Sequence, residues 1–191
     1  RNEQDSIAKS VTSLLAQDYP GRLSIIVVDD NSEDATAAIA EALPHETGSR
    51  VQLTVLRGEP LAQRWTGKLW AVHQGIEAAT KKNPDFLLLT DADIVYEPDV
   101  VRWLAAHSVA HGNVLTSLMA RLRCESFAER AFVPAFVYFF EMLYPFAWVN
   151  DPRNRIAAAA GGCMLVKADA LAKAGGIAVI RDALIDDCSL A

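Results

Sequence analysis

The chain has 191 residues, of which 51% are hydrophobic and 22% are charged, and its formal net charge is −6. This length is enough for one domain with a substantial core, and the composition is that of a globular rather than a disordered protein. The negative net charge argues against a general nucleic-acid-binding surface.

Helical patterns and apolar runs alternate along the first 120 residues. Continuous apolar runs predict buried strands, and apolar residues at helical spacing predict helices. We expect strands at residues 23–30, 51–58, 86–93 and 113–122, and helices at residues 10–16, 34–43, 68–81 and 98–111. This alternation predicts an α/β domain with a mainly parallel sheet, in which ligands bind beyond the carboxyl ends of the strands.

The second half is less regular and contains one strongly aromatic segment, residues 127–150. Its length approaches that of a membrane span, but charged residues and prolines interrupt it. The interrupting residues are Glu129, Arg130, Pro134, Glu141 and Pro145. Besides a spanning helix, which is the least favoured, the pattern leaves open a packed helix and an interfacial or lipid-facing surface. Residues 161–176 then predict a strand and a helix closed by glycines.

The cysteines and the chain ends bear on the cellular setting. Cys124, Cys163 and Cys188 are far apart and lack metal-ligand spacing, so we expect reduced thiols in a cytoplasmic compartment. The chain starts without a methionine and stops where a helix begins. We therefore interpret it as part of a longer protein.

Asp91 and Asp93 follow the most apolar strand-like run, "FLLLTDAD". Alternate side chains of an extended segment point the same way. Two such carboxylates can share Mg²⁺ or Mn²⁺, which keeps phosphate or water oxygens in its remaining positions. The alternative is a pair of solvated loop acids.

Two further motifs at strand or helix ends suit a nucleotide. Asp29 and Asp30 follow "IIVV", where a carboxylate can accept hydrogen bonds from a base or ribose, although turn-forming acids are the alternative. Lys68 follows a glycine at the expected start of a helix, where it could hold a phosphate. The glycine spacing is not that of a P-loop, and a surface lysine is the other interpretation.

Asp186 and Asp187 lie in "ALIDDCSLA" near the end of the chain. Acids in the first turn of a helix favour its dipole, which is a purely structural role. One of them could instead be a general base that deprotonates an attacking hydroxyl group. Gly161 and Gly162 precede an expected strand and suggest that another group approaches the backbone closely there.

Taken in order, these motifs resemble the inverting family 2 glycosyltransferases of the GT-A fold. The resemblance runs through "RNE", "QDYPG", "IIVVDDNSEDAT", "RWTGKLWAVHQG", "TDADI", "GGCMLV" and "IDD". The "WTGKLWA" variant and the aromatic middle look most like the hopanoid-biosynthesis-associated branch, with carotenoid-type glycosyltransferases next. The resemblance implies a Rossmann-like, mainly parallel sheet flanked by helices. It also implies that the first strand of that sheet and a C-terminal segment lie outside this chain.

The resemblance implies a role for each donor-side residue. Glu3 would lie near the ribose or base of a nucleotide sugar, and Asp30, with Asp29 beside it, would contact the base. Lys68 would approach the diphosphate. The metal-binding pair would be Asp91 and Asp93, with Asp93 as the direct ligand of Mg²⁺ or Mn²⁺.

The same resemblance implies a catalytic base and a domain plan. Asp187 would be the base, and Asp186 stands where the family more often has Glu, which leaves open which of the two acts. Residues 1–191 would form one partial catalytic domain, with a nucleotide-sugar-binding half at 1–120 and an acceptor-side half at 121–191.

The implied function is an inverting glycosyltransferase. It would move a sugar from a nucleotide-sugar donor, expected to be UDP-linked, to a hydroxyl group of a lipid or other acceptor, with the help of a divalent metal ion. The full-length enzyme would be membrane-associated on the cytoplasmic side.

Two other functions remain open on sequence alone. A haloacid-dehalogenase-like phosphatase would use Asp91 of "DADIV" as nucleophile and Asp93 as general acid, with Asp186 and Asp187 at a second metal site. However, that loop usually lies near the chain start, and the strand before Asp29 would be unexplained. A non-catalytic sugar-nucleotide-binding module is the third possibility, because the "IDD" motif is altered.

Overall fold

The computed structural model describes residues 1–44, 48–183 and 186–191, the last range without the side chains of Asp186 and Asp187. Helices and strands alternate through the first part of the chain, as expected. The strands are β1 (Leu23–Asp29), β2 (Val51–Arg57), β3 (Phe86–Thr90), β4 (Leu115–Ser117) and β5 (Cys163–Lys167). The helices are α1 (Ile7–Leu15), α2 (Thr36–Glu41), α3 (Gly67–Thr80), α4 (Val100–His111), α5 (Phe127–Leu143), α6 (Phe146–Val149), α7 (Ala168–Lys173), the 3₁₀ helix η1 (Ile177–Ile180) and α8 (Asp186–Leu190).

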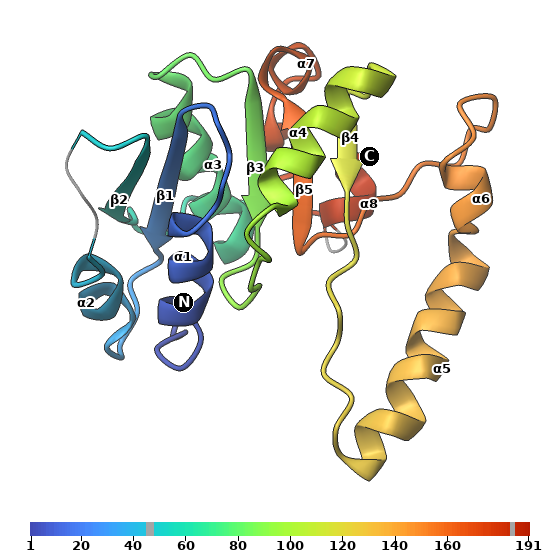
Figure 1. Ribbon diagram of the computed structural model, residues 1–191, viewed down its shortest axis with the longest axis horizontal. Helices are drawn as coiled ribbons and strands as arrows, with labels where there is room; N and C mark the ends of the chain where they lie inside the picture. The colour runs from blue at the N-terminus through green and yellow to red at the C-terminus, as the bar shows by residue number, and fades with distance from the viewer. Residues whose placement is uncertain (45–47, 184–185) are drawn as a thin grey trace.

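The strands form two groups, which confirms the α/β class (Figure 1). Strands β1 and β2 are parallel, from Leu23 opposite Val51 to Asp29 opposite Arg57. In the second group β5 lies between β3 and β4 and runs antiparallel to both. A continuous apolar run such as "CMLV" is typical of a parallel strand that is buried on both faces, but in β5 it belongs to a buried antiparallel strand. The antiparallel course of β5 therefore could not be seen in the sequence.

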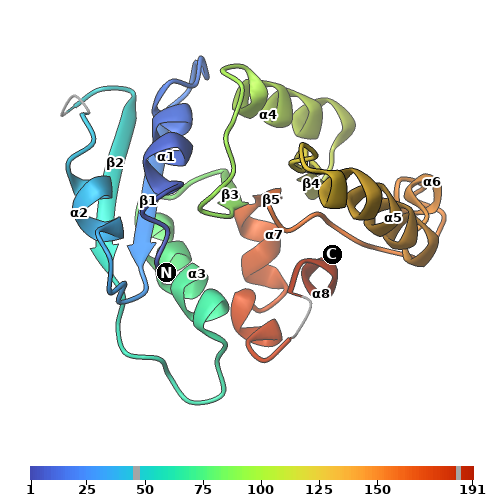
Figure 2. The ribbon, with the colours of Figure 1, turned by 90° about the horizontal axis from the view of Figure 1, so that it is seen from below.

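Helices cover both sides of the strands. Figure 2 shows α1 and α4 on one side and α3, α7 and α8 on the other. One core of buried side chains extends across both groups of strands, although no backbone pairing joins the two groups among the described residues. It includes Ile7, Val11 and Leu14 of α1, Ile25 of β1, Leu53 of β2, Leu104 of α4 and Leu165 of β5.

Strand β3 is shorter than expected, and this changes the surroundings of the acids that follow it. We predicted an extended segment to Asp93, but β3 ends at Thr90 and the next residues turn, with the Ile94 N–H 3.5 Å from the Asp91 carbonyl oxygen. The turn returns the chain to the core, where Tyr96 is buried. Asp91 and Asp93 are therefore not alternate residues of one strand.

Helices α5 and α6 form an arm that stands away from the rest of the molecule (Figure 1). The helix α5 begins at a capping box: Ser126 Oγ accepts from the Glu129 N–H at 3.2 Å, and Glu129 Oε2 accepts from the Ser126 N–H at 2.8 Å. No residue of α5 or α6 is buried, so a packed helix is the wrong interpretation of residues 127–150. No helix in the described ranges is long and apolar enough to cross a membrane.

Candidate active site

The candidate site lies where the carboxyl ends of β1 and β3 meet the first turn of α3. Gly58 donates its N–H to the Asp29 carbonyl oxygen at 2.8 Å. A Cβ at Gly67 would lie 3.2 Å from Asp30 Oδ2, which places the Asp30 carboxylate directly against the start of α3. Two motifs that are 37 positions apart thus share one site, as expected for strand ends in an α/β fold.

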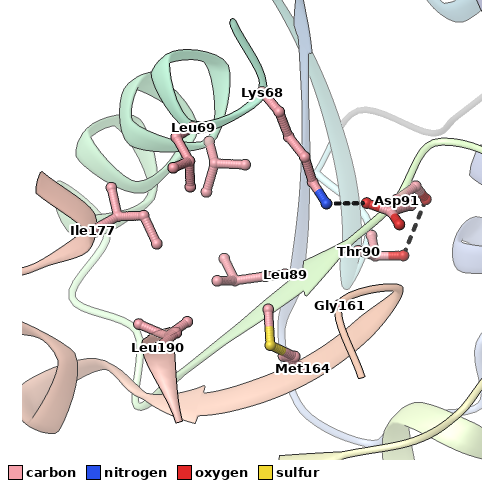
Figure 3. A pocket seen from close by; sticks show the side chains of 10 residues that line it. Lys68, Leu69, Leu89, Thr90, Asp91, Gly161, Met164, Ile177 and Leu190 are labelled. Carbon is pink, nitrogen blue, oxygen red and sulfur yellow. Dashed lines mark hydrogen bonds and ion pairs between the residues drawn. The ribbon is translucent and has the colours of Figure 1, made fainter. Parts of the chain in front are cut away.

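Lys68 reaches across this site to the end of β3. Its Nζ lies 3.0 Å from Asp91 Oδ1, and the two side chains are 50% and 39% exposed (Figure 3). An ion pair this exposed contributes little to stability, so its members can change partner at low cost. Lys68 and Asp91 thus present a positive and a negative charge side by side at this site.

The start of α3 is suited to a phosphate. Thr66 caps the helix, with its Oγ1 3.4 Å from the Leu69 N–H. The remaining N–H groups of a first helical turn have no partner in the helix, and the helix dipole favours an anion there. Lys68 stands in this turn and adds a full positive charge.

Aromatic and amide side chains of α3 hold the loop that leads into this turn. Trp70 Nε1 donates to the Glu59 carbonyl oxygen at 3.2 Å, and Gln74 Oε1 accepts from the Glu59 N–H at 2.8 Å. The rings of Trp65 and His73 stack at 4.7 Å. Sequence reasoning missed this clamp, although the spacing of Trp70, His73 and Gln74 on one helical face was the available signal.

Asp29 and Asp30 have different surroundings. Asp29 is buried, and both of its carboxylate oxygens lie 3.3 Å from the Ser32 N–H. It therefore stabilises the turn after β1, which was the structural alternative for this pair. Asp30 is half-buried and faces the start of α3, so it is the better candidate for contact with a ligand.

Glu3 lies at the start of α1, beside the loop that follows β1. Its Oε2 accepts from Ser6 Oγ at 2.8 Å, and its N–H donates to Thr36 Oγ1 at 2.8 Å. The neighbouring Asn2 N–H donates to Ser32 Oγ at 3.0 Å. The structure thus joins the "RNE" segment to the loop of Asp29 and Asp30.

Asp91 packs against the glycine pair that precedes β5. The Asp91 N–H lies 3.4 Å from the Gly162 carbonyl oxygen. A Cβ at Gly162 would lie 3.2 Å from the Ile94 side chain and 3.8 Å from Asp91 Oδ2. The close approach expected at these glycines is therefore present, and it is the turn after β3 that approaches.

A buried tyrosine, which sequence reasoning missed, fixes the end of β3. Tyr96 Oη donates to Thr90 Oγ1 at 2.8 Å, and Thr90 Oγ1 donates to the Asp91 carbonyl oxygen at 3.2 Å. Burial, together with the neighbouring Cys163, raises the pKa of Tyr96 well above its ordinary value. Burial also raises the pKa of the Cys163 thiol. Both groups therefore stay neutral, and Tyr96 remains a hydrogen-bond donor.

A small cavity of about 20 Å³ lies behind the Lys68–Asp91 pair (Figure 3). This is room for about one water molecule. Its polar side is formed by Lys68, Thr90, Asp91 and Gly161, and its apolar wall by Leu69, Val72, Leu89, Met164, Ile177 and Leu190. Leu190 belongs to α8, so the helix that begins at Asp186 lies against the site. The side chains of Asp186 and Asp187 themselves lie outside the described part of the structure.

The oxygen ligands for a metal ion are few. Asp93 is exposed in the turn after Asp91. The described residues contain no group of three or more His, Cys, Asp or Glu side chains that could hold a metal ion together. The site fits a Mg²⁺ or Mn²⁺ that takes one or two carboxylates from the protein and the other oxygens from a diphosphate and water.

Comparison with known proteins assigns this arrangement to a family. Residues 1–175 match glycosyl transferase family 2. An N-acetylglucosaminyltransferase of Azorhizobium caulinodans is 33% identical over 135 residues, which are 68% of this chain and 31% of that protein. N-acetylglucosaminyltransferases of Rhizobium leguminosarum biovars viciae and trifolii are 33% and 31% identical, over 52% and 59% of this chain and 21% and 58% of their own lengths. The chain therefore belongs to glycosyl transferase family 2.

The family assignment confirms the coarser part of the resemblance seen in the sequence. The match covers β1 and its acids as well as β3, whereas the phosphatase interpretation left β1 unexplained. Each curated relative is longer than the segment that matches, which spans less than two thirds of it. Membership of the hopanoid-associated branch stays a prediction.

Proposed function

We propose that the protein is an inverting glycosyltransferase that moves a sugar from a nucleotide-sugar donor to a hydroxyl group. The observation that supports this most directly is the exposed Lys68–Asp91 pair, 3.0 Å apart at the start of α3, with Asp30 against the same turn. These groups suit a nucleoside diphosphate in a family 2 domain. The cation and the start of the helix can bind its phosphates, and the acid can hold a metal ion.

In this proposal the donor lies across the ends of β1 and β3. Asp30, with Glu3 beside its loop, contacts the nucleoside, and Asp29 holds the turn. The Lys68 ammonium group leaves Asp91 and pairs with the diphosphate. The negative charge of the diphosphate increases as its bond to the sugar breaks. A cation already in place stabilises that charge where it develops.

Asp91 and Asp93 hold the divalent ion in this proposal. The Asp91 carboxylate, once its pair with Lys68 is broken, would be one oxygen ligand, and the exposed Asp93 would be the second. When bound, Mg²⁺ or Mn²⁺ would neutralise part of the charge on the leaving nucleoside diphosphate.

A carboxylate of α8 serves as the base, with Asp187 as the first candidate and Asp186 as the second. It takes the proton of the acceptor hydroxyl group while the acceptor oxygen bonds to the anomeric carbon. The bond from that carbon to the diphosphate breaks on the opposite face, so the anomeric configuration inverts. The contact of Leu190 with the cavity supports a place for α8 at the site.

The similar proteins suggest a particular donor, and the aromatic arm suggests a class of acceptor. Because the similar curated proteins are N-acetylglucosaminyltransferases, UDP-linked N-acetylglucosamine is the first donor to test. The exposed aromatic arm supports a lipid-type acceptor, and the "WTGKLWA" motif suggests a polycyclic lipid of the hopanoid type. We place the full-length enzyme at the cytoplasmic side of a membrane.

Isothermal titration against a panel of nucleoside diphosphates, with and without Mn²⁺, tests the donor half. We expect metal-dependent binding that Asp93→Asn abolishes while the fold is unchanged by circular dichroism. Unchanged affinity of Asp93→Asn at saturating Mn²⁺ would exclude its role as a ligand. Indifference to every nucleotide, with turnover of a phosphomonoester, would instead favour the phosphatase.

The catalytic half is tested by Asp187→Asn in the full-length protein. We expect this variant to bind the donor as the unchanged protein does but to lose transfer, because only the proton acceptor is gone. Normal transfer by Asp187→Asn would move the role to Asp186. Donor binding without any transfer by the unchanged protein would favour a non-catalytic binding module.

A further inference from the structure

The arm formed by α5 and α6 carries large apolar side chains that no other described residue covers. Phe127 is 90% exposed and Phe132 is 73% exposed. Six further large apolar residues of the arm are more than half exposed: Phe136, Tyr138, Phe139, Met142, Leu143 and Trp148. A contiguous apolar surface of this kind marks a site of interaction with a membrane or another molecule.

The apolar residues surround α5 almost completely. At about 100° per residue, Arg130 and Glu141 fall within about 20° of each other and form a narrow polar strip. The remaining charged residue of α5, Glu129, turns back to cap the start of the helix. An interface with a second copy needs one apolar stripe and leaves the opposite face polar, whereas here only the narrow strip is polar.

Positive charges stand at both ends of the arm and in its strip. Residues 121–155 contain five arginines and four acids, a net charge of +1, in a chain whose net charge is −6. Arg121 and Arg155, which lie beyond the two ends of the arm, are exposed and form no ion pair with another described residue. These guanidinium groups complement an anionic surface, such as one of acidic phospholipids.

We propose that the α5–α6 arm lies in the plane of an anionic bilayer surface, with its aromatic residues among the lipid chains and the Arg130–Glu141 strip toward water. This inference rests on the proposed function, because it brings the donor site to a lipid acceptor. Tyr138, Tyr144 and Trp148 have the apolar body and polar tip that suit the boundary between lipid and water. With 17 residues, α5 would cover about 26 Å of that surface.

The arm leaves and rejoins the molecule next to the candidate site. Where it departs, Ser117 Oγ accepts from the Ala160 N–H at 3.2 Å, and the Leu118 N–H donates to the Cys163 carbonyl oxygen at 3.0 Å. Between those points of return lies Gly161, which lines the cavity beside Asp91. The segment that carries the arm therefore begins and ends beside the candidate site.

Co-sedimentation with phosphatidylcholine vesicles, with and without phosphatidylglycerol, tests this inference. We expect the protein to bind the anionic vesicles more tightly. The Phe136→Ser/Phe139→Ser variant should lose about tenfold in partition coefficient for each ring removed from lipid. The Arg121→Gln/Arg155→Gln variant should lose about fivefold per arginine, and only on the anionic vesicles.

A matched control and a second measurement keep the result decisive. Val95→Ser/Val109→Ser removes two exposed apolar side chains outside the arm and should bind vesicles as the unchanged protein does. Equal binding by the phenylalanine variant, or no binding by the unchanged protein, overturns the inference. Sedimentation velocity tests a second copy as the occupant instead. That alternative is identified if the unchanged protein is a dimer that does not bind vesicles and the Phe136→Ser/Phe139→Ser variant is a monomer. Vesicle binding without any nucleotide binding would support the membrane-binding role of the arm and reject the proposed function.

Discussion

Lys68 is the residue whose neighbours change most if a diphosphate binds. We expect Lys68→Ala to weaken nucleoside diphosphate binding by about 1.5–3 kcal/mol, the range for a hydrogen bond to a charged group. The nucleoside alone should bind almost unchanged, because its proposed contacts lie at Asp30. Calorimetric titration of both ligands measures the difference.

Lys81→Ala is the control for Lys68→Ala, since Lys81 is exposed just beyond the far end of the same helix. Equal weakening of nucleoside and diphosphate in Lys68→Ala would place the ammonium group away from the phosphates.

Tyr96 acts on Asp91 through Thr90 and through the Gly162 carbonyl oxygen, which is 3.5 Å from Tyr96 Oη, so we regard it as a positioning residue. We expect Tyr96→Phe to lower the free energy of unfolding by about 0.5–1.5 kcal/mol, because one buried hydrogen bond is lost. It should also weaken Mn²⁺-dependent nucleotide binding but leave metal-free nucleoside binding unchanged. Urea unfolding and paired titrations measure the two effects; loss of stability alone would reduce Tyr96 to a core residue.

At the residue scale, the positions of the site's acids and lysine could be predicted from the sequence, but the residues that hold them in place could not. Lys68, Asp30 and Asp91 stand at helix and strand ends, and such positions can be read from apolar runs and their breaks. The roles of Tyr96 and Trp70 could not be predicted, because each depends on a partner brought near by the fold. Asp29 was grouped with Asp30, although its contacts are those of a turn.

Among the elements, α5 depends on its capping box because few of its other residues make contacts with the rest of the chain. Hydrogen bonds from the backbone N–H groups of Ser126 and Glu125 lower the pKa of Glu129 below its ordinary value. The stabilisation is therefore complete above the unfolded pKa and disappears as the pH falls through the lower folded pKa. We expect the first turn of α5 to lose helix in that acidic range, measured by far-UV circular dichroism.

Two substitutions separate the charge of Glu129 from its shape. Glu129→Gln keeps a capping oxygen and should remove the acid-dependent change, whereas Glu129→Ala should lose the first turn at every pH. If Glu129→Gln retained the same acid-dependent change as the unchanged protein, the titrating group would lie elsewhere.

Element types could be predicted from periodicity more reliably than element ends and directions. The helix at 68–81 is found within one residue, as α3 (Gly67–Thr80). The end of β3 was placed three residues too late, because Asp91 and Asp93 were assigned to the strand although Asp also favours turns. The arm could not be placed, since an aromatic run looks the same whether it faces a core or the surroundings.

For the whole molecule, cohesion between the two groups of strands comes from side chains. Leu104 is fully buried in α4 and belongs to the core that joins them. We expect Leu104→Ala to lower the free energy of unfolding by about 2–5 kcal/mol, through lost burial and a residual cavity. Chemical denaturation should still show one transition, because one core serves both groups.

Val109→Ala is the matched change on the exposed face of α4 and should alter the free energy of unfolding by no more than about 0.5 kcal/mol. Two separate transitions in Leu104→Ala would mean that the β1–β2 and β3–β5–β4 groups unfold independently.

The hydrogen bond between Ser117 and Ala160 joins residues 43 positions apart, so the chain between them is an excursion that starts and ends at one point. The entropy cost of closing such a loop grows only with the logarithm of its length. Its length and composition can therefore change during evolution without moving Gly161 or Asp91. A single peripheral segment can in this way be exchanged while the candidate site keeps its geometry.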